Sequence, residues 1–426
     1  MLPDDEPIQD APIVRASTRG PESLPFWKTI PRYEREYSFK DFSRVLSVLS
    51  TRTAPDTAAV EHFPAAERIL FRSGRECLFV ILKALKLRAR ARVGVPLYCC
   101  GAVFESIAAA GCVPVFLDVD LNTYSVDLDF LGRIRTSLDV IVVIHTFGYP
   151  ANLSAVRACL GSHQVPIVED CAQALFSESE GHFVGTQTQA SFFSFGLHKP
   201  AAVGGGGLAV FNDPDLAQSA ARESCQLTSE SVGRELRHVL ICWARSLAYC
   251  RPIYGALLAS ALGRFRDRQA SCVGKDGTLE EVKAYSPARM RWSDQTLLES
   301  RIGRFRDELP ALSRNTQFLR SALQNASLEI PAEPSHGVWN HFLLPVRYGN
   351  ANRRTVGRQL LRRFRVDTGP LYRNCIVDAR RFGYTGECPK AEEAAQTVCT
   401  VPNHACLSAS QIEFIGEALR RSAEIA

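Results

Sequence analysis

The sequence predicts an α/β fold in which a mostly parallel sheet is covered by helices on both faces. Between residues 71 and 211, short apolar runs alternate with segments of helical pattern. Some runs, such as DVIVVIHTFG at 139–148, are apolar almost throughout, which is typical of strands buried on both sides. Hydrophobic residues make up 46% of the 426 residues, enough for a sizeable core.

The elements follow one another in a regular order. Strands are expected at 93–98, 113–119, 139–148, 165–170 and 191–195, and helices at 76–87, 103–111, 128–135 and 150–160. Ligands bind at the carboxyl ends of strands in such sheets. Residues 96–100, 145–148 and 169–173 are therefore expected around one crevice.

The second half of the chain breaks this rhythm. Residues 213–285 read as helical segments that carry arginine, and a strand (HFLLPV, 341–346) with helices at 355–364 and 408–426 suggests a small α+β domain. We expect a flexible leader at 1–22 and a large domain at 23–290 with a helical insertion at about 215–285. The small C-terminal domain is expected at 291–426.

Composition excludes several classes of protein. The net charge is only +5 and the arginines alternate with acids, which argues against a nucleic-acid surface. None of the 14 cysteines forms a CxxC pair, so we expect reduced thiols in a cytoplasmic protein, and no metal site. The apolar region 239–262 is interrupted by Arg245 and Arg251, which favours two packed or interfacial helices over a membrane span. Weak contact of 237–262 with a membrane surface stays open.

Lys199 stands between the apolar run SFFSF and four glycines, 204–207. An exposed lysine is usually only solvated, but a partly desolvated one is a usable amine for Schiff-base chemistry. Asp170 ends a strand, where it would either cap the next helix or pair with a cationic ring nitrogen, as pyridoxal phosphate (PLP) requires. Gly74 and Arg75 open a helix, which is a ready anion site, and Ser194 could add a hydroxyl.

Seven ordered motifs carry a resemblance: SGRECL (73–78), VP followed after fourteen residues by glycine (95–111), PVFLDVD (114–120), HTFGYPAN (145–152), VEDCAQAL (168–175), VGT (184–186), and SFGLHK (194–199) with GGGG (204–207). The match extends to ARM (288–290) and TGPLY (368–372). The series resembles the DegT/StrS family of PLP-dependent sugar aminotransferases, of the fold-type I aspartate aminotransferase superfamily. The resemblance implies a three-layer α/β/α domain with a seven-stranded sheet, and a homodimer. It also implies transfer of an amino group from an amino acid, typically glutamate, to a keto-sugar nucleotide.

The same resemblance assigns roles to residues. Lys199 would form the Schiff base and move the proton, Asp170 would pair with the pyridine nitrogen, and Gln173 would contact the ring. The phosphate would be held by Gly74, Arg75 and Ser194, the ring-stacking position is Cys100, and the substrate side would include Tyr98, His145 and Tyr372.

Four positions depart from the family pattern: Arg75 stands where threonine or serine is common, Cys100 replaces the stacking aromatic residue, Gly205 a glutamate and Pro287 an asparagine. Two alternatives therefore stay open. One is a PLP enzyme that acts on another keto acceptor, such as a cyclitol or an amino-acid-derived ketone. The other is a non-catalytic descendant that binds PLP or a sugar nucleotide. The sugar, ring position, nucleotide and amino donor are not specified by these motifs.

Overall fold

A computed structural model describes residues 21–51, 55, 60–61, 63, 65–224, 227–259 and 285–425. Its main sheet has seven strands in the order β1-β9-β8-β5-β4-β2-β3. The five strands from β8 to β3 are parallel, and β9 is antiparallel to both of its neighbours. The predicted mostly parallel sheet is thus confirmed. The strands are β1 (Glu67–Phe71), β2 (Arg92–Pro96), β3 (Val113–Leu117), β4 (Val140–Ile144), β5 (Ile167–Asp170), β8 (Ala190–Ser194) and β9 (Gly207–Phe211).

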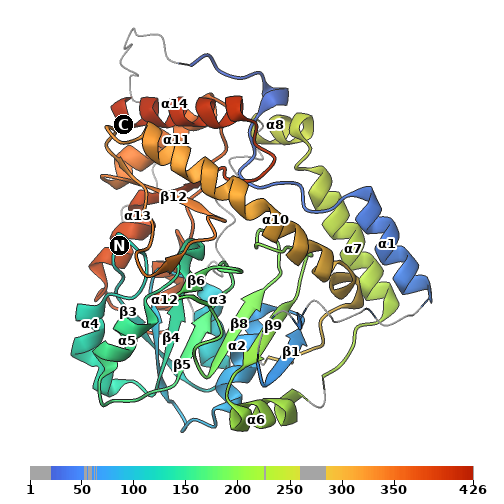
Figure 1. The fold of residues 1–426 in the computed structure, drawn as a ribbon, viewed down its shortest axis with the longest axis vertical. Coiled ribbons are helices and arrows are strands. Elements are labelled where there is room, and N and C mark those ends of the chain that lie inside the picture. Colours follow the sequence, from blue (N-terminus) through green and yellow to red (C-terminus); the bar gives the residue numbers. More distant parts are fainter. Residues whose placement is uncertain are drawn as a thin grey trace.

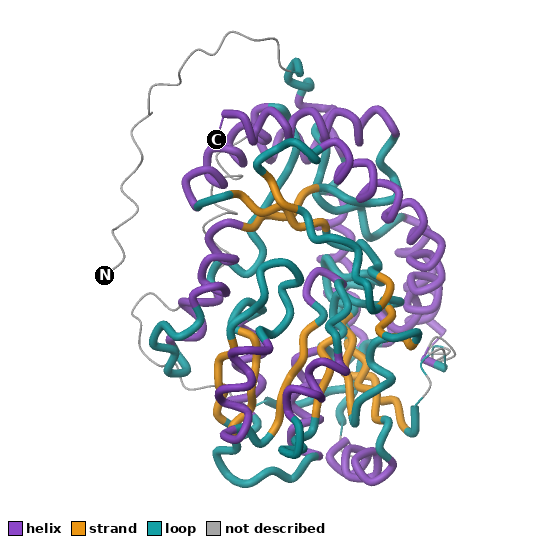
Figure 2. Tube along the Cα trace, turned by 60° about the vertical axis from the view of Figure 1, so that its left-hand side comes forward, coloured by secondary structure: helices purple, strands orange, loops and turns teal. Residues whose placement is uncertain are grey.

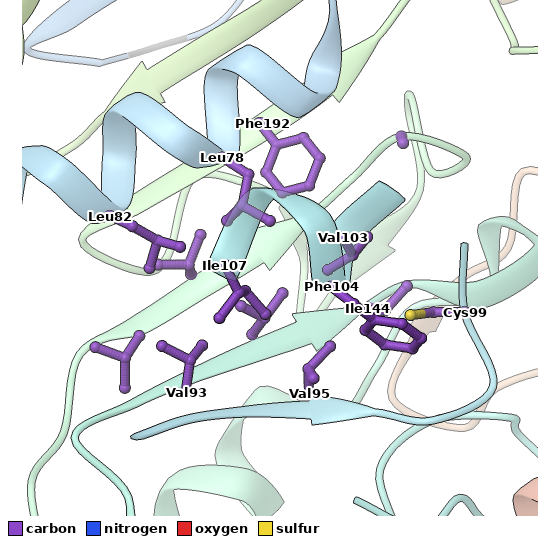
Figure 3. Close-up of a cluster of buried hydrophobic side chains, with 14 of the residues drawn as sticks. Leu78, Leu82, Val93, Val95, Cys99, Val103, Phe104, Ile107, Ile144 and Phe192 are labelled. Atoms are coloured by element: carbon purple, nitrogen blue, oxygen red, sulfur yellow. The ribbon is translucent and has the colours of Figure 1, made fainter. Parts of the chain in front are cut away.

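Alternation along the strands sends side chains to two separate cores. In β4, Val140, Val142 and Ile144 pack towards α2 and α3, whereas Ile141 and Val143 pack towards α4 and α5. Figure 3 shows part of the first core, between α2, α3 and the sheet. The helices are α2 (Gly74–Ala84), α3 (Gly101–Ala109), α4 (Leu128–Ile134), α5 (Leu153–Leu160) and α6 (Pro214–Ser224), with short 3-10 turns η3 (Arg135–Ser137) and η4 (Thr146–Gly148).

Three helices cover the sheet beside β8 and β9: α1 (Phe39–Thr51), α7 (Val232–Leu247) and α10 (Trp292–Ala322). In Figure 1, α10 runs diagonally from beside α1 and α7 to beneath α14. Its residues Leu297 and Leu312 belong to the large-sheet core and Leu319 to the small-sheet core. Because α10 spans both cores, the domain boundary at 290/291 stays a prediction.

A smaller antiparallel sheet, β10-β12-β13, is built from the C-terminal part of the chain. In Figure 2 it lies between the helices at the top of the view and the main sheet below. It comprises β10 (Leu328–Glu329), β12 (Leu344–Tyr348) and β13 (Val398–Val401), and packs with α11 (Ala351–Arg363) and α14 (Ala409–Ile425). The predicted strand at 341–346 began too early, because His341 has a φ of 55° and the extended backbone begins only at Leu344.

The remaining elements are connections. They are η1 (Phe26–Lys28), α8 (Arg251–Ala259), α12 (Cys375–Arg380), α13 (Pro389–Thr397) and a small sheet of β6 (Glu178–Ser179), β7 (His182–Phe183) and β11 (Gly337–Val338). The apolar region from 239 forms α7 and α8, as the two-helix prediction requires, up to the last described residue, 259. Most of the expected leader and residues 260–284 of the insertion lie outside the described residues.

Candidate active site

One cavity at the carboxyl edge of the large sheet collects most of the predicted site residues. Its volume is about 110 Å³. Nine of the ten predicted residues line it: Gly74, Arg75, Cys100, His145, Asp170, Gln173, Ser194, Lys199 and Tyr372. These residues come from the ends of several strands and from the C-terminal part of the chain, so the fold builds the site from distant segments.

The first turn of α2 forms one end of the cavity. Ser73 caps this helix by accepting a hydrogen bond from the Glu76 backbone N–H. Gly74 packs closely on β8, because a Cβ placed at Gly74 would lie 3.1 Å from Ser194 Cβ. The first N–H groups of a helix have no partner within the helix and carry partial positive charge. Together with Ser194 and the guanidinium of Arg75, this end suits a phosphate.

Gly206 is hydrogen-bonded to the residues that follow β1 and β8, at the same end of the cavity as the start of α2. Its N–H donates to Arg72 O (2.8 Å), after β1, and its carbonyl accepts from Phe195 N–H (3.0 Å), after β8. Its φ of 102° lies in the left-handed region, where glycine is strongly favoured. The glycine run therefore brings the start of α2 against Ser194, as well as making a tight loop.

Asp170 and Lys199 occupy the other end. Asp170 ends β5 and is buried, and its Oδ1 accepts from Ala172 N–H at 2.9 Å. Burial raises the pKa of Asp170, while the charge of Lys199 opposes that shift. Among the described residues, no side-chain donor is hydrogen-bonded to the Asp170 carboxylate. It can therefore accept a hydrogen bond from a protonated ring nitrogen, so the buried acid fits the group that the resemblance implies.

The loop that carries Lys199 is held by contacts with the segment that precedes α1. Tyr33 stacks on His198, with ring centroids 4.1 Å apart, and the His198 N–H donates to Glu36 Oε1 at 2.7 Å. The Tyr37 hydroxyl donates to Val203 O. Because these contacts come from the segment before α1, that segment fixes the position of Lys199.

Gln173 links the sheet to the C-terminal part. Its Oε1 accepts from Phe147 N–H and its Nε2 donates to the Tyr372 hydroxyl, both at 2.6 Å. Burial raises the pKa of Tyr372 well above its usual value, so the phenol stays neutral. Gln173 is thus held by two protein partners at the cavity wall.

His145 forms part of the wall. It is completely buried, and its Nδ1 accepts from Ala151 N–H, which places the ring proton on Nε2, 3.0 Å from Glu169 Oε2. Burial alone would raise the pKa of Glu169, but hydrogen bonds from His145, Gly185 N–H and the Thr188 hydroxyl lower it. His145, Glu169 and Cys171 place possible metal ligands within 4.8 Å of one another, but these hydrogen bonds already satisfy the pair.

The structure does not bring Tyr98 to the cavity. Its ring is fully buried beside Tyr124 and Phe147, and its hydroxyl donates to Leu371 O at 3.2 Å. The chain turns after β2, where Cys99 N–H donates to Leu97 O, and this turn directs Tyr98 into the core. Cys100, by contrast, lines the cavity and is exposed.

Apolar wall residues were missed in the sequence. Four of them, labelled in Figure 3, belong to the core beside α2 and α3: Leu78, Val103, Ile144 and Phe192. Strand alternation could have identified Phe192, because residues two apart in a strand share a face and Ser194 follows it.

Gly205, which departs from the family pattern, lies beside Asp294, a neighbour that the sequence did not reveal. A Cβ at position 205 would lie 2.9 Å from Oδ2 of Asp294, which is buried in α10. Asp294 Oδ1 lies 2.9 Å from His238 Nε2 of α7. A carboxylate from a distant helix therefore lies beside the position where the family pattern has a glutamate.

Comparisons with known proteins agree with this geometry. Residues 56–240 match the DegT/DnrJ/EryC1/StrS aminotransferase family. UDP-N-acetyl-3-dehydro-alpha-D-glucosamine 3-aminotransferase of Acidithiobacillus ferrooxidans is 32% identical over 146 residues, which are 34% of this chain and only 40% of that relative. L-glutamine:2-deoxy-scyllo-inosose aminotransferase of Streptomyces lividus is 26% identical over 400 residues, 86% of each chain.

Solved structures show that the likeness in fold extends along the chain. The PLP form of the putative sugar aminotransferase Spr1654 from Streptococcus pneumoniae has a TM-score of 0.72 at 17% identity and covers 93% of this chain and 100% of that one. Aminotransferase TlmJ from Streptoalloteichus hindustanus has a TM-score of 0.69 at 22% identity, covering 92% and 98%. These likenesses confirm the expected fold-type I architecture. Residues 56–240 are thus similar to the DegT/DnrJ/EryC1/StrS aminotransferase family, and the chain as a whole shares the fold of the solved aminotransferases.

Proposed function

We propose that the chain is a PLP-dependent aminotransferase that moves an amino group from an amino acid, first of all glutamate, to the keto group of a nucleotide-linked sugar. One observation carries the proposal: a single cavity is shared by Lys199, Asp170, Gln173, Ser194 and the first turn of α2. No single motif requires all of these groups, but PLP chemistry needs an amine, a buried acid and an anion site together.

Each residue has a distinct task in this proposal. Bound PLP would supply an electron sink at the carbon that loses or gains the amino group. Asp170 would keep the ring nitrogen protonated, because a buried carboxylate that lacks a partner charge is unstable. The N–H groups of Gly74 and Arg75 and the Ser194 hydroxyl would hold the phosphate. Lys199 Nζ would take the proton from the substrate carbon and return it.

A second acceptor class is supported by one comparison. The relative from Streptomyces lividus aligns along most of this chain, and its name specifies L-glutamine as donor and 2-deoxy-scyllo-inosose, a keto-cyclitol, as acceptor. A keto-cyclitol acceptor with glutamine as donor is therefore the first alternative. The homodimer expected from the family resemblance is part of the same proposal, and analytical ultracentrifugation tests it.

Cofactor binding is tested separately from turnover. The purified protein should be yellow with PLP, and borohydride reduction should fix the mass of the cofactor on the peptide that contains Lys199. Lys199→Ala should abolish this adduct, whereas Lys83→Ala, at an exposed position in α2, should leave it unchanged. Absence of the adduct from the wild-type protein, or its presence in Lys199→Ala, would refute the role of Lys199.

The acceptor is then identified by a matched panel. Nucleotide keto-sugars and keto-inositols are each offered with glutamate and with glutamine, and amine formation is followed by mass spectrometry. Amination of a nucleotide keto-sugar supports the main proposal, and amination only of a keto-inositol supports the alternative. A protein that holds PLP on Lys199 and shows no change in its visible absorbance with any amino donor would instead be a non-catalytic binder.

A further inference from the structure

Exposed apolar side chains are concentrated on four neighbouring elements. Among the described residues, sixteen large hydrophobic side chains are exposed, and nine of them lie on η1, α1, α7 and α8. Figure 1 shows α1 and α7 side by side at one edge of the molecule, with α8 above them. The nine are Phe26, Trp27, Phe39, Leu46, Val232, Leu236, Leu240, Ile241 and Ile253.

α1 and α7 run antiparallel, because Tyr37, just before α1, donates its N–H to Ser246 Oγ near the end of α7 at 2.8 Å. The rings of Phe42 and Trp243 meet between the helices, with centroids 5.5 Å apart. Residues three, four and seven apart share a helix face. Phe39 and Leu46 therefore lie on the α7 side of α1.

By the same spacing, Leu236 and Leu240 share the side of α7 that carries Trp243 and faces α1. Both leucines are exposed. The exposed apolar side chains of the two helices thus meet in one strip over the Phe42–Trp243 contact. We call this strip, formed by Phe39, Leu46, Leu236 and Leu240, the α1–α7 seam.

The exposed charged side chains of α1 and α7 are basic, whereas the acidic side chain of each helix is bonded to other parts of the protein. Asp41, the acid of α1, accepts from Arg301 at 2.8 Å, and Glu235, the acid of α7, accepts from Trp292 and Ser293 N–H. No exposed acidic side chain lies within these two described helices. Their exposed cations are Lys40, Arg44, Arg234, Arg237 and Arg245.

We propose that the α1–α7 seam docks the chain on an anionic phospholipid surface, with both helices lying in the plane of the interface. Apolar side chains beside basic ones on helices of this kind are typical of interfacial binding. None of the described helices is long and apolar enough to cross a membrane.

Charge argues against a second copy of the chain as the occupant. A two-fold contact through this surface would bring the same patch together from both copies. The exposed charged side chains of these two helices, which include Arg44, Arg234 and Arg237, would then all be cationic, with no exposed acid from the same helices to neutralise them. An anionic lipid surface supplies the opposite charge, and each basic residue near it adds about fivefold to binding.

Vesicle co-sedimentation of the full chain tests the proposal. Vesicles of phosphatidylcholine are compared with an equimolar mixture of phosphatidylcholine and phosphatidylglycerol, at low and high salt. We expect binding to the anionic vesicles only, weakened by salt. Arg234→Gln/Arg237→Gln should reduce it by about 20-fold or more, and Leu236→Gln/Leu240→Gln by about tenfold.

Val356→Gln/Val377→Gln is the matched control, because both valines are exposed on helices away from the seam. Circular dichroism and thermal melting check that each variant is folded. Equal binding to neutral and anionic vesicles, no binding, or an equal loss in the control overturns the proposal. A change of oligomeric state in the leucine variant without vesicle binding would assign the seam to a second copy instead.

Discussion

Replacing Gly207 with alanine should damage the anion end of the cavity. Gly207 begins β9, directly under the first turn of α2. An added Cβ would lie 2.6 Å from Gly74 N, 2.7 Å from Ser73 C and 2.8 Å from Cys77 Sγ. Two of these atoms belong to the backbone, so no side-chain rotation relieves the contact.

The size of the effect follows from the geometry. Ordinary contact begins at 3.4 Å, so 3.4 minus 2.6 leaves the helix start about 0.8 Å too close. Overpacking of this kind costs about 1–3 kcal/mol. The shift moves the N–H groups proposed to hold the phosphate. We therefore expect PLP affinity to fall by about tenfold or more, since tenfold corresponds to about 1.4 kcal/mol.

The assay is titration of the apo-protein with PLP, followed by absorbance, together with urea unfolding. Gly303→Ala is the control, because Gly303 lies in α10 with nothing within 4 Å of an added Cβ. It should keep PLP affinity and gain about 0.5–1 kcal/mol of stability. If Gly207→Ala bound PLP as tightly as the wild type, the anion site would not be at the start of α2.

Three further changes test the surrounding charges. Asp170→Asn should leave the protein able to bind PLP but lower the transamination rate by about 100-fold or more, measured in single turnover. Gly205→Glu should lower the free energy of unfolding by about 3 kcal/mol, because it adds a second carboxylate beside buried Asp294. The same change should cost less when it is made in an Asp294→Asn protein, as urea unfolding would show. Burial alone would lower the pKa of His238, but the hydrogen bond and charge of Asp294 raise it to about 10. The stabilising contribution of protonated His238 is fully present below pH about 6.5 and is lost as the pH rises through about 10. The difference in free energy of unfolding between wild type and His238→Gln should therefore be about 3 kcal/mol at pH 6 and shrink towards pH 10.

Each of these expectations has a contrary result. An Asp170→Asn protein with the wild-type rate would remove Asp170 from the chemistry. Additive losses in the Gly205 and Asp294 pair would show that the two positions do not interact. A pH-independent effect of His238→Gln would mean that the imidazole is neutral when folded.

The sequence by itself determined the sheet and the chemical groups at its edge. Apolar runs and helical periodicity encode burial locally, so the parallel strands and the placement of Asp170 at the end of one of them follow from pattern alone. Lys199 was identifiable because its neighbours, SFFSF and the glycines, are unlike those of a surface lysine. The resemblance then named Gln173 and Ser194, and both line the cavity.

Only the tertiary structure decided which distant segments meet. Gly206 ties the end of β1 to the end of β8, which sets Gly74 against Ser194, 120 positions later in the chain. Asp294 reaches Gly205 from α10, 89 positions later in the chain. Tyr98 turns into the core, although its position after a strand pointed to the cavity. Local pattern fixes whether a residue is buried, but strand order and helix packing fix its neighbours, and these arise from pairings far apart in sequence.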